Sequence, residues 1–355
     1  MAIDVASAAA TTSASHDAED HAVHDKQQSV QGVEGAKAKG VWWPRIRKWG
    51  LPIFGIVVLG LLLSHAHKID WAGAWEALKR YPPLLLLAGL GIATLSHALY
   101  GFYDLVGKLH TRHRVPAWET WAIAVASYAF NLNLGSLVGG VAMRARLYAR
   151  AGLDEATIAQ VVGLSLATNW LGYSLVAGGL FASGAVTLPG SAHIGHSALR
   201  ALGIAMMLLA VAYVLACTRY GGHKFTIRGR RIRLPAVGIA LLQLALSTTN
   251  WALMGAVMYT LLRGEVPYPT VLGVLMTASI VGVITPIPAG LGVLEAVCLA
   301  LLSGHMRQGA LMGAVLAYRA LYYLLPLLGG IALYAALERY ASAHASETAS
   351  QPPSP

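Results

Sequence analysis

Two residues of opposite charge occupy equivalent positions in two related apolar segments of this sequence. A register shift of 151 residues, without a gap, brings Arg144 onto Glu295 and Gly139 onto Gly290. An arginine in such a segment suits a phosphate group, because its guanidinium forms charge-assisted hydrogen bonds with phosphate oxygens. The pattern therefore predicts a duplicated unit with one cationic and one carboxylate-bearing half-site.

Turn-forming residues break both segments near the middle. Pro286 and Pro288 cannot lie inside a helix without the loss of hydrogen bonds, and the glycines that follow them allow a sharp turn. The helix after the turn begins with unpaired N–H groups and a partial positive charge, which together favour anions. We expect both turns, residues 131–140 and 285–292, to lie at the centre of the protein.

Two further ionisable residues lie within the apolar portion. Glu295 is in the first turn of the helix after the second break, where the helix dipole favours its charge, and Arg319 lies inside the last apolar run. Ionisable residues inside a membrane are costly, so these two either take part in function or neutralise each other as a structural pair. In both cases we expect them within ion-pair distance.

The other polar residues near these segments have two interpretations each. His97, Tyr100 and Asp104 share one helix face and could relay protons, although polar packing and a membrane-edge anchor explain them more simply. Arg146 and Arg150 either extend the cationic half-site or anchor a cytoplasmic face. The candidate substrate-binding residues are Asn131, Gly139, Arg144, Pro286, Pro288, Gly290, Gly292, Glu295 and Arg319. No catalytic residue, metal site or cofactor is predicted.

The composition indicates what holds these residues in place. Hydrophobic residues make up 56% of the chain, charged residues 12%, and the mean hydropathy is +0.57, which is typical of a polytopic helical membrane protein. Two apolar segments, 119–150 and 269–302, are longer than one span and are broken at the middle. Single spans are predicted near 49–66, 82–106, 157–182, 198–217, 236–262 and 308–337.

The distribution of basic residues predicts the topology. If both broken segments crossed the membrane once, lysines and arginines would divide 12 inside against 13 outside. If both instead return to the face they left, 19 lie inside against six outside, as the positive-inside rule requires. We therefore predict an all-α polytopic fold of six spans and two re-entrant hairpins, with three crossings and one hairpin in each of two inverted repeats.

The same pattern predicts the domain organisation. Residues 1–45 and 341–355 lack apolar periodicity and are predicted to be disordered tails, both cytoplasmic, with the first apolar run kept as an anchor. Residues 46–200 form the first membrane repeat and residues 201–340 the second. Cys217 and Cys298 lie in apolar segments, so neither a disulfide nor a thiol metal site is indicated.

Two motifs carry a resemblance to a known family. The segment Thr285–Ala296, with the sequence TPIPAGLGVLEA, resembles the P-x-P-G-G-L-G-x-x-E-A signature of the lysylphosphatidylglycerol synthase transmembrane-domain family. Residues 131–152 are similar to its upstream motif, and Tyr318-Arg319 matches its late tyrosine and arginine. Ala289 departs from the usual glycine, which affects the expected turn geometry. The resemblance covers about residues 48–340 and implies a lipid-flippase-like domain without the aminoacyl-transferase of two-part members, so lipid lysylation is not expected.

Three classes of function are consistent with these features. We favour a translocator of a phospholipid or other lipid-linked anion in a bacterial inner (plasma) membrane. The alternative is a non-transporting membrane partner or regulator of a separate lipid- or glycan-modifying transferase. An intramembrane enzyme is disfavoured because no metal-protease motif or paired carboxylates are found, and nucleic-acid binding is disfavoured because the excess positive charge lies on one membrane face. The sequence does not indicate an oligomeric state.

Overall fold

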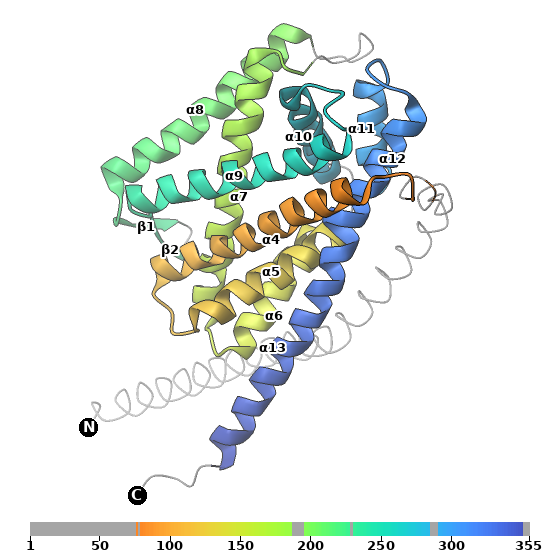
Figure 1. Cartoon of the computed structure of the whole chain (residues 1–355). Helices are drawn as coiled ribbons and strands as arrows, with labels where there is room; N and C mark the ends of the chain where they lie inside the picture. The colour runs from red at the N-terminus through yellow and green to blue at the C-terminus, as the bar shows by residue number, and fades with distance from the viewer. Residues whose placement is uncertain (1–75, 77–78, 187–194, 228–229, 285–289, 351–355) are drawn as a thin grey trace, which may run out of the picture. The chain divides into compact units, whose positions relative to one another are not determined.

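Long apolar helices dominate the computed structural model, which describes residues 76, 79–186, 195–227, 230–284 and 290–350. Five helices in these residues are long and apolar enough to cross a membrane (Figure 1). All five match predicted spans; the predictions for residues 1–45 and 49–66 fall outside the described residues. Four of them are α4 (Pro83–Thr111), α7 (Glu155–Ser183), α8 (His196–Tyr220) and α9 (Val237–Leu261). The fifth, Gln308–Ala343, is continuous through α12 (Gln308–Tyr318), the π-helix η3 (Arg319–Leu324) and part of α13 (Leu325–Ser350).

The two broken segments fold as helical hairpins. The first comprises α5 (Ala117–Leu134), the π-helix η1 (Ser136–Ala142) and α6 (Met143–Arg150), and α5 packs against both η1 and α6. The second comprises α10 (Tyr268–Ile284) and α11 (Val293–Leu302), which pack against each other. Pro286 and Pro288 of its turn fall outside the described residues. The re-entrant course of the hairpins through the bilayer stays a prediction.

Helix boundaries recur at the register at which the residues recur. Helix α5 begins at Ala117 and α10 begins at Tyr268, 151 residues later. Beyond the ends of α4 and α9, Arg112 and Arg263 both adopt a positive φ, of 56° and 54°, and they are also 151 residues apart. The order of elements is therefore the same in the two halves from α4 to α6 and from α9 to α11.

Helices α4 and α9 lie side by side and antiparallel (Figure 1). Just before α4 begins, the Tyr81 hydroxyl donates to the carbonyl of Leu261 at the end of α9, over 3.0 Å. Further along, Ser96 Oγ of α4 donates to Asn250 Oδ1 of α9 over 2.8 Å. Two helices at equivalent positions in the duplicated sequence thus run in opposite directions.

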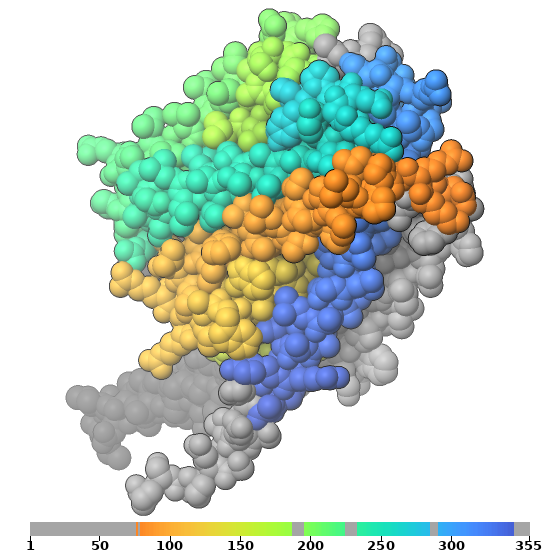
Figure 2. Space-filling model, viewed as in Figure 1, coloured from red at the N-terminus to blue at the C-terminus, as the bar shows by residue number. Residues whose placement is uncertain are grey.

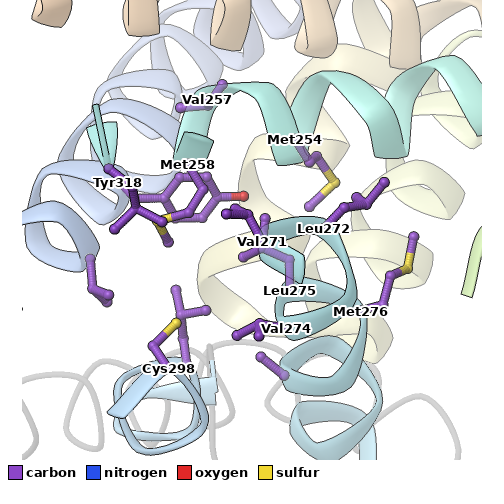
Figure 3. Packing of buried hydrophobic residues seen from close by; sticks show 14 of the residues in the cluster. Met254, Val257, Met258, Val271, Leu272, Val274, Leu275, Met276, Cys298 and Tyr318 are labelled. Atoms are coloured by element: carbon purple, nitrogen blue, oxygen red, sulfur yellow. The ribbon is translucent and has the colours of Figure 1, made fainter. Parts of the chain in front are cut away.

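The largest apolar cluster lies where the second hairpin packs on α9 and α12. Buried side chains of α10, such as Leu272 and Leu275, meet Met254 and Met258 of α9, with Cys298 of α11 in the same cluster (Figure 3). This buried apolar face holds the hairpin against the long helices.

Two segments form regular structure that the sequence does not predict. The basic loop 219–233 between α8 and α9 contains a short antiparallel hairpin of β1 (Lys224–Ile227) and β2 (Arg230–Arg233), with Lys224 opposite Arg233. Helix α13 continues to Ser350, into the segment predicted as a disordered tail. Its alanines and glutamate favour helix, and extending an existing helix avoids the cost of nucleation. The predicted repeat boundary at residues 200–201 falls inside α8.

Close packing of α7 on α8 depends on two glycines. A Cβ built on Gly178 would lie 2.8 Å from the Gly203 carbonyl oxygen, and one built on Gly203 would lie 2.6 Å from the Gly178 oxygen. Small residues of this kind let helix backbones approach each other in a membrane, where the hydrophobic effect does not drive association.

The variant Gly178→Ala is expected to destabilise the protein by about 1–3 kcal/mol, because the added methyl group overpacks this interface. Gly179→Ala is the matched control, since a Cβ at Gly179 meets nothing within 4 Å on the same helix. It should be neutral or up to about 1 kcal/mol more stable. Thermal unfolding of the detergent-solubilised variants measures the difference, and equal melting temperatures would contradict the packing role.

Candidate functional site

The first hairpin carries a fully buried ion pair. Arg144 of α6 and Asp104 of α4 are joined by an Nε–Oδ2 hydrogen bond of 3.0 Å, and their side chains are 1% and 0% exposed. The Tyr148 hydroxyl donates to the same carboxylate oxygen over 2.9 Å, and Arg144 Nη1 donates to the Gly140 carbonyl over 3.1 Å. Charges so far from water persist only when they are paired and hydrogen-bonded, so α6 is tied to α4 at this point.

Local backbone geometry brings Arg144 to Asp104. After α5 the chain turns at Gly135, with a φ of 84°, and then forms the π-helix η1 directly before α6. A Cβ on Gly139 would lie 2.3 Å from the Asn131 backbone nitrogen, and one on Gly140 would lie 2.9 Å from Asn131 Oδ1. The predicted site residues Asn131 and Gly139 therefore pack the two arms of the hairpin together, next to the buried arginine. π-Helical turns of this kind are frequent at functional sites.

The Arg144–Asp104 pair leaves hydrogen-bonding capacity unused. Among the residues that the structure describes, Arg144 Nη2 and Asp104 Oδ1 have no hydrogen-bond partner, although both are shielded from water. The guanidinium carbon lies 5.4 Å from the centre of the Tyr100 ring, a cation–π contact. The contact between the two charged groups is therefore through one nitrogen and one oxygen, rather than through the two parallel bonds that an arginine and a carboxylate can form.

The second hairpin carries the ion pair that the sequence predicts. Glu295 of α11 accepts two hydrogen bonds from Arg319, one from Nε to Oε1 and one of 2.9 Å from Nη2 to Oε2. Arg319 Nη2 also donates to the Gly290 carbonyl over 2.9 Å. The two side chains are 8% and 17% exposed for Arg319 and Glu295, respectively. The predicted positive φ of Gly290 and Gly292 is confirmed, at 55° and 82°.

The two pairs have opposite polarity. The first hairpin contributes the arginine and a long helix contributes the carboxylate, whereas the second hairpin contributes the carboxylate and η3 contributes the arginine. In both halves the arginine also donates to the carbonyl of a turn glycine, Gly140 or Gly290. Each hairpin is thus fastened to a long helix at its buried charge.

Asp104 is the residue that sequence reasoning missed. It was expected to be a membrane-edge anchor or packing residue, but it is buried and neutralises Arg144. The partners of Arg144 among the described residues all lie in its own half, and most of the turn of the second hairpin, residues 285–289, falls outside the described residues, so a site shared by the two hairpins stays a prediction. The signal that could have found the pair is the presence of one aspartate in an apolar span and one arginine in the hairpin that follows it.

A polar cluster joins the two halves. Ser96 Oγ lies 2.6 Å from the Tyr322 hydroxyl, which lies 3.0 Å from that of Tyr128. The His97 ring packs against both tyrosines, at centroid distances of 5.0 and 4.8 Å, and its Nδ1 lies 2.9 Å from its own helix's Ala93 carbonyl. His97 therefore faces this cluster and Asp104 faces Arg144, so the two do not form the relay considered from the sequence.

Arg146 and Arg150 lie at the surface, as the anchor interpretation predicts. Their guanidinium groups lie 3.2 and 3.3 Å from the carboxylate of Glu338 on α13, which also accepts a hydrogen bond of 2.8 Å from Tyr334. Both arginines are about half exposed, so the pairs add little stability.

The loops next to the first hairpin contain two titratable groups with displaced pKa values. Hydrogen bonds from Thr157 lower the pKa of Asp154, the N-cap of α7. Burial, assisted by the charge of Lys108, lowers the pKa of His113, so this ring is neutral at pH 7. Both residues line a polar pocket of about 370 Å³ between the end of α4 and the start of α7.

Removal of one partner of a buried pair should cost more than removal of both. Arg144→Gln and Asp104→Asn are each expected to destabilise the protein by about 3–5 kcal/mol, because each leaves one charge buried alone, and the double variant should cost less than either. Glu295→Gln and Arg319→Gln should show the same coupling with smaller values, since this pair is less buried.

Unfolding of the detergent-solubilised proteins measures both double-mutant cycles. Arg146→Gln is the control on the same helix, with an expected loss of at most about 1 kcal/mol because its pair is exposed. Additive losses in either cycle would show that the two residues of that pair are not coupled.

Comparisons with known proteins agree with this architecture. A sequence model of the lysylphosphatidylglycerol synthase TM region matches residues 52–330. The chain is similar to the inner membrane protein YbhN of Escherichia coli (strain K12), with 41% identity over 300 residues that cover 84% of this chain and 94% of YbhN. It is also similar to the uncharacterized protein slr0712 of Synechocystis sp., with 26% identity over 292 residues, which cover 80% of this chain and 90% of the relative. The chain is therefore a multi-pass membrane protein that belongs to the lysylphosphatidylglycerol synthase transmembrane-region family.

Proposed function

We propose that this protein moves an anionic phospholipid, or another lipid-linked anion, between the leaflets of a bacterial inner membrane. The observation that carries the proposal is the pair of buried arginines, each beside a helical hairpin and each neutralised by a carboxylate of the protein. Buried arginines of this kind are costly in a membrane, and they suit a substrate that can take the place of the carboxylate.

The binding step in this proposal is the exchange of one anion for another. A lipid phosphate that reaches Arg144 can replace Asp104, so the guanidinium stays paired while the hairpin is released from α4. Arg144 Nη2 lacks a hydrogen-bond partner among the described residues, so it can donate a hydrogen bond to a phosphate oxygen before the Asp104 carboxylate leaves. Arg144 then stays paired throughout, while Asp104 keeps the hydrogen bond from Tyr148 and must take up a proton to avoid remaining as an unpaired buried charge.

The arrangement of the two halves supports alternating access. Helices α4 and α9 occupy equivalent places in the duplicated sequence and run antiparallel, which is the relation expected of inverted repeats. We propose six spans and two re-entrant hairpins, with both termini in the cytoplasm and the hairpins open to opposite faces. The turn at Gly135 and the π-helices beside each arginine are the points at which the hairpins would bend.

The resting pairs also favour a second candidate function. Arg144 and Arg319 are both already neutralised, so both pairs act as structural clamps in this conformation. A protein with permanently clamped hairpins would be a non-transporting partner or regulator of a separate transferase that modifies lipids or glycans. The two functions differ in whether the pairs open.

Labelling of single cysteines tests the topology in a background with Cys217→Ala and Cys298→Ala. Thr226→Cys, in β1, should react with a membrane-impermeant maleimide only after the cells are opened, because the basic loop is proposed to face the cytoplasm. Ser303→Cys, in the exposed turn after α11, should react in intact cells. Labelling of Thr226→Cys in intact cells would overturn the proposed hairpin topology.

Liposomes with fluorescent phosphatidylglycerol or phosphatidylcholine in one leaflet test the transport itself. The wild type should speed the movement of the anionic lipid, and Arg144→Gln and Gly290→Val should slow it at least tenfold, about 1.4 kcal/mol or more in activation free energy. Arg146→Gln, two residues away and exposed, should match the wild type.

The two candidate functions give opposite results in this assay. A folded, membrane-inserted wild-type protein that moves no lipid excludes the translocator. If the Arg144→Gln strain also behaves as wild type where a deletion strain does not, the regulatory function replaces it.

A further inference from the structure

We propose that a groove between the end of α4 and the start of α9 binds an anionic phospholipid from the surrounding leaflet and leads it to the Arg144–Asp104 pair. The role as an access path rests on the proposed function, whereas lipid binding in the groove does not. The groove has a volume of about 720 Å³ and is mostly apolar. A pocket of this size accommodates a large organic ligand.

The walls of the groove suit an acyl chain. Phe102, Leu105 and Leu109 of α4 line one side, and Leu242 and Leu246 of α9 line the other. Phe102, Leu109 and Leu242 are exposed large hydrophobic residues. Figure 2 shows α4 and α9 next to each other on one face of the molecule. The groove therefore runs along the last turns of α4 and the first turns of α9, where it can take part of an acyl chain.

The polar residues of the groove are all basic or neutral. Lys108, Arg112 and His113 line it at the end of α4, and none of the described residues that line it is acidic. Lys108 Nζ is held at this position by the His113 carbonyl, 2.8 Å away, and by that of Val115. An anionic headgroup is thus the chemistry that complements the rim, as basic residues beside a membrane helix attract anionic lipids.

His113 adds an observation that is independent of charge. Its two ring nitrogens are shielded from water and have no hydrogen-bond partner among the described residues. An unsatisfied buried polar group costs free energy, which a phosphate oxygen that accepts from the ring would recover. His113 lines both this groove and the polar pocket next to it, so its ring lies between an apolar and a polar space.

The inner end of the groove approaches the buried pair. Leu246 packs against the cluster of Tyr100, Tyr103 and Tyr128, and the Tyr100 ring centre lies 5.4 Å from the guanidinium carbon of Arg144. On the other side the His113 ring lies 6.0 Å from the ring of Tyr148, which donates to Asp104. One layer of aromatic side chains therefore separates the groove from the pair.

Photocrosslinking of the full-length protein in nanodiscs tests this assignment. p-Benzoylphenylalanine at Phe102 is irradiated in discs of equal amounts of phosphatidylglycerol and phosphatidylcholine, and the adducts are identified by mass spectrometry. We expect phosphatidylglycerol adducts in excess. Arg112→Asn should reduce that excess about fivefold, the effect of one basic residue near an anionic surface. Asparagine tolerates the positive φ of this position, so the backbone is kept.

Two matched controls separate the groove from general effects. Arg263→Asn changes the equivalent arginine, which has the same backbone conformation and lies over the Tyr81 ring, and should leave the adducts unchanged. Leu242→Trp should fill the groove and remove most adducts. Leu241→Trp, an exposed neighbour that does not line the groove, should not.

Each other outcome overturns a defined part of the proposal. If the two lipids form adducts in equal amounts and Arg112→Asn changes neither amount, the groove is not a site for an anionic headgroup. Adducts with the chain's own residues before position 76, or with a second copy, exclude lipid as the occupant. If Leu242→Trp removes the adducts but transport of phosphatidylglycerol continues, the groove is not the access path and the proposed function stands. If lipid binds in the groove but neither the wild type nor any variant transports it, the lipid site is supported and the proposed function is wrong.

Discussion

An arginine cannot stay charged and unpaired in the interior of a membrane protein, and this constraint determines how both hairpins are placed. Each hairpin is fastened to a neighbouring helix at the point where its buried charge meets an opposite charge. Around these two points the apolar residues pack by size, as at Gly139 against Asn131 and at Gly178 against Gly203. The charges therefore specify where the hairpins attach, and packing specifies how closely.

Much of the architecture was predictable because it follows from local pattern. Apolar length identified the five long helices, and turn-forming residues located both breaks. The Glu295–Arg319 pair was predicted because both residues are exceptional in apolar surroundings. The role of Asp104 was missed because an aspartate seven residues from the end of α4 is also typical of a membrane edge. Its contact with Arg144 depends on the backbone of η1, which the sequence does not predict. The hairpin β1–β2 and the extension of α13 carry no apolar signal, so composition predicted neither of them.

The two halves are joined by buried polar contacts and, at the surface, by the half-exposed pairs of Arg146 and Arg150 with Glu338. Ser96, Asn250, Tyr128 and Tyr322 connect α4, α9, α5 and η3 through short hydrogen bonds. Hydroxyl and amide groups of this kind are worth about 0.6 kcal/mol each on average in membrane proteins, much less than a buried charge pair. Relative movement of the halves would therefore break weak contacts first and leave each hairpin attached to its own half.

The unequal strength of the two clamps has a thermodynamic consequence. Under the proposed function, identical inverted halves would make the inward-open and outward-open conformations equally populated, with an equilibrium constant of one. In this protein Arg319 donates to Glu295 through two nitrogens, whereas Arg144 donates to Asp104 through one. The two conformations would then differ in free energy, and a difference of about 1.4 kcal/mol between the two pairs is enough for a tenfold preference for one of them in the absence of any ligand.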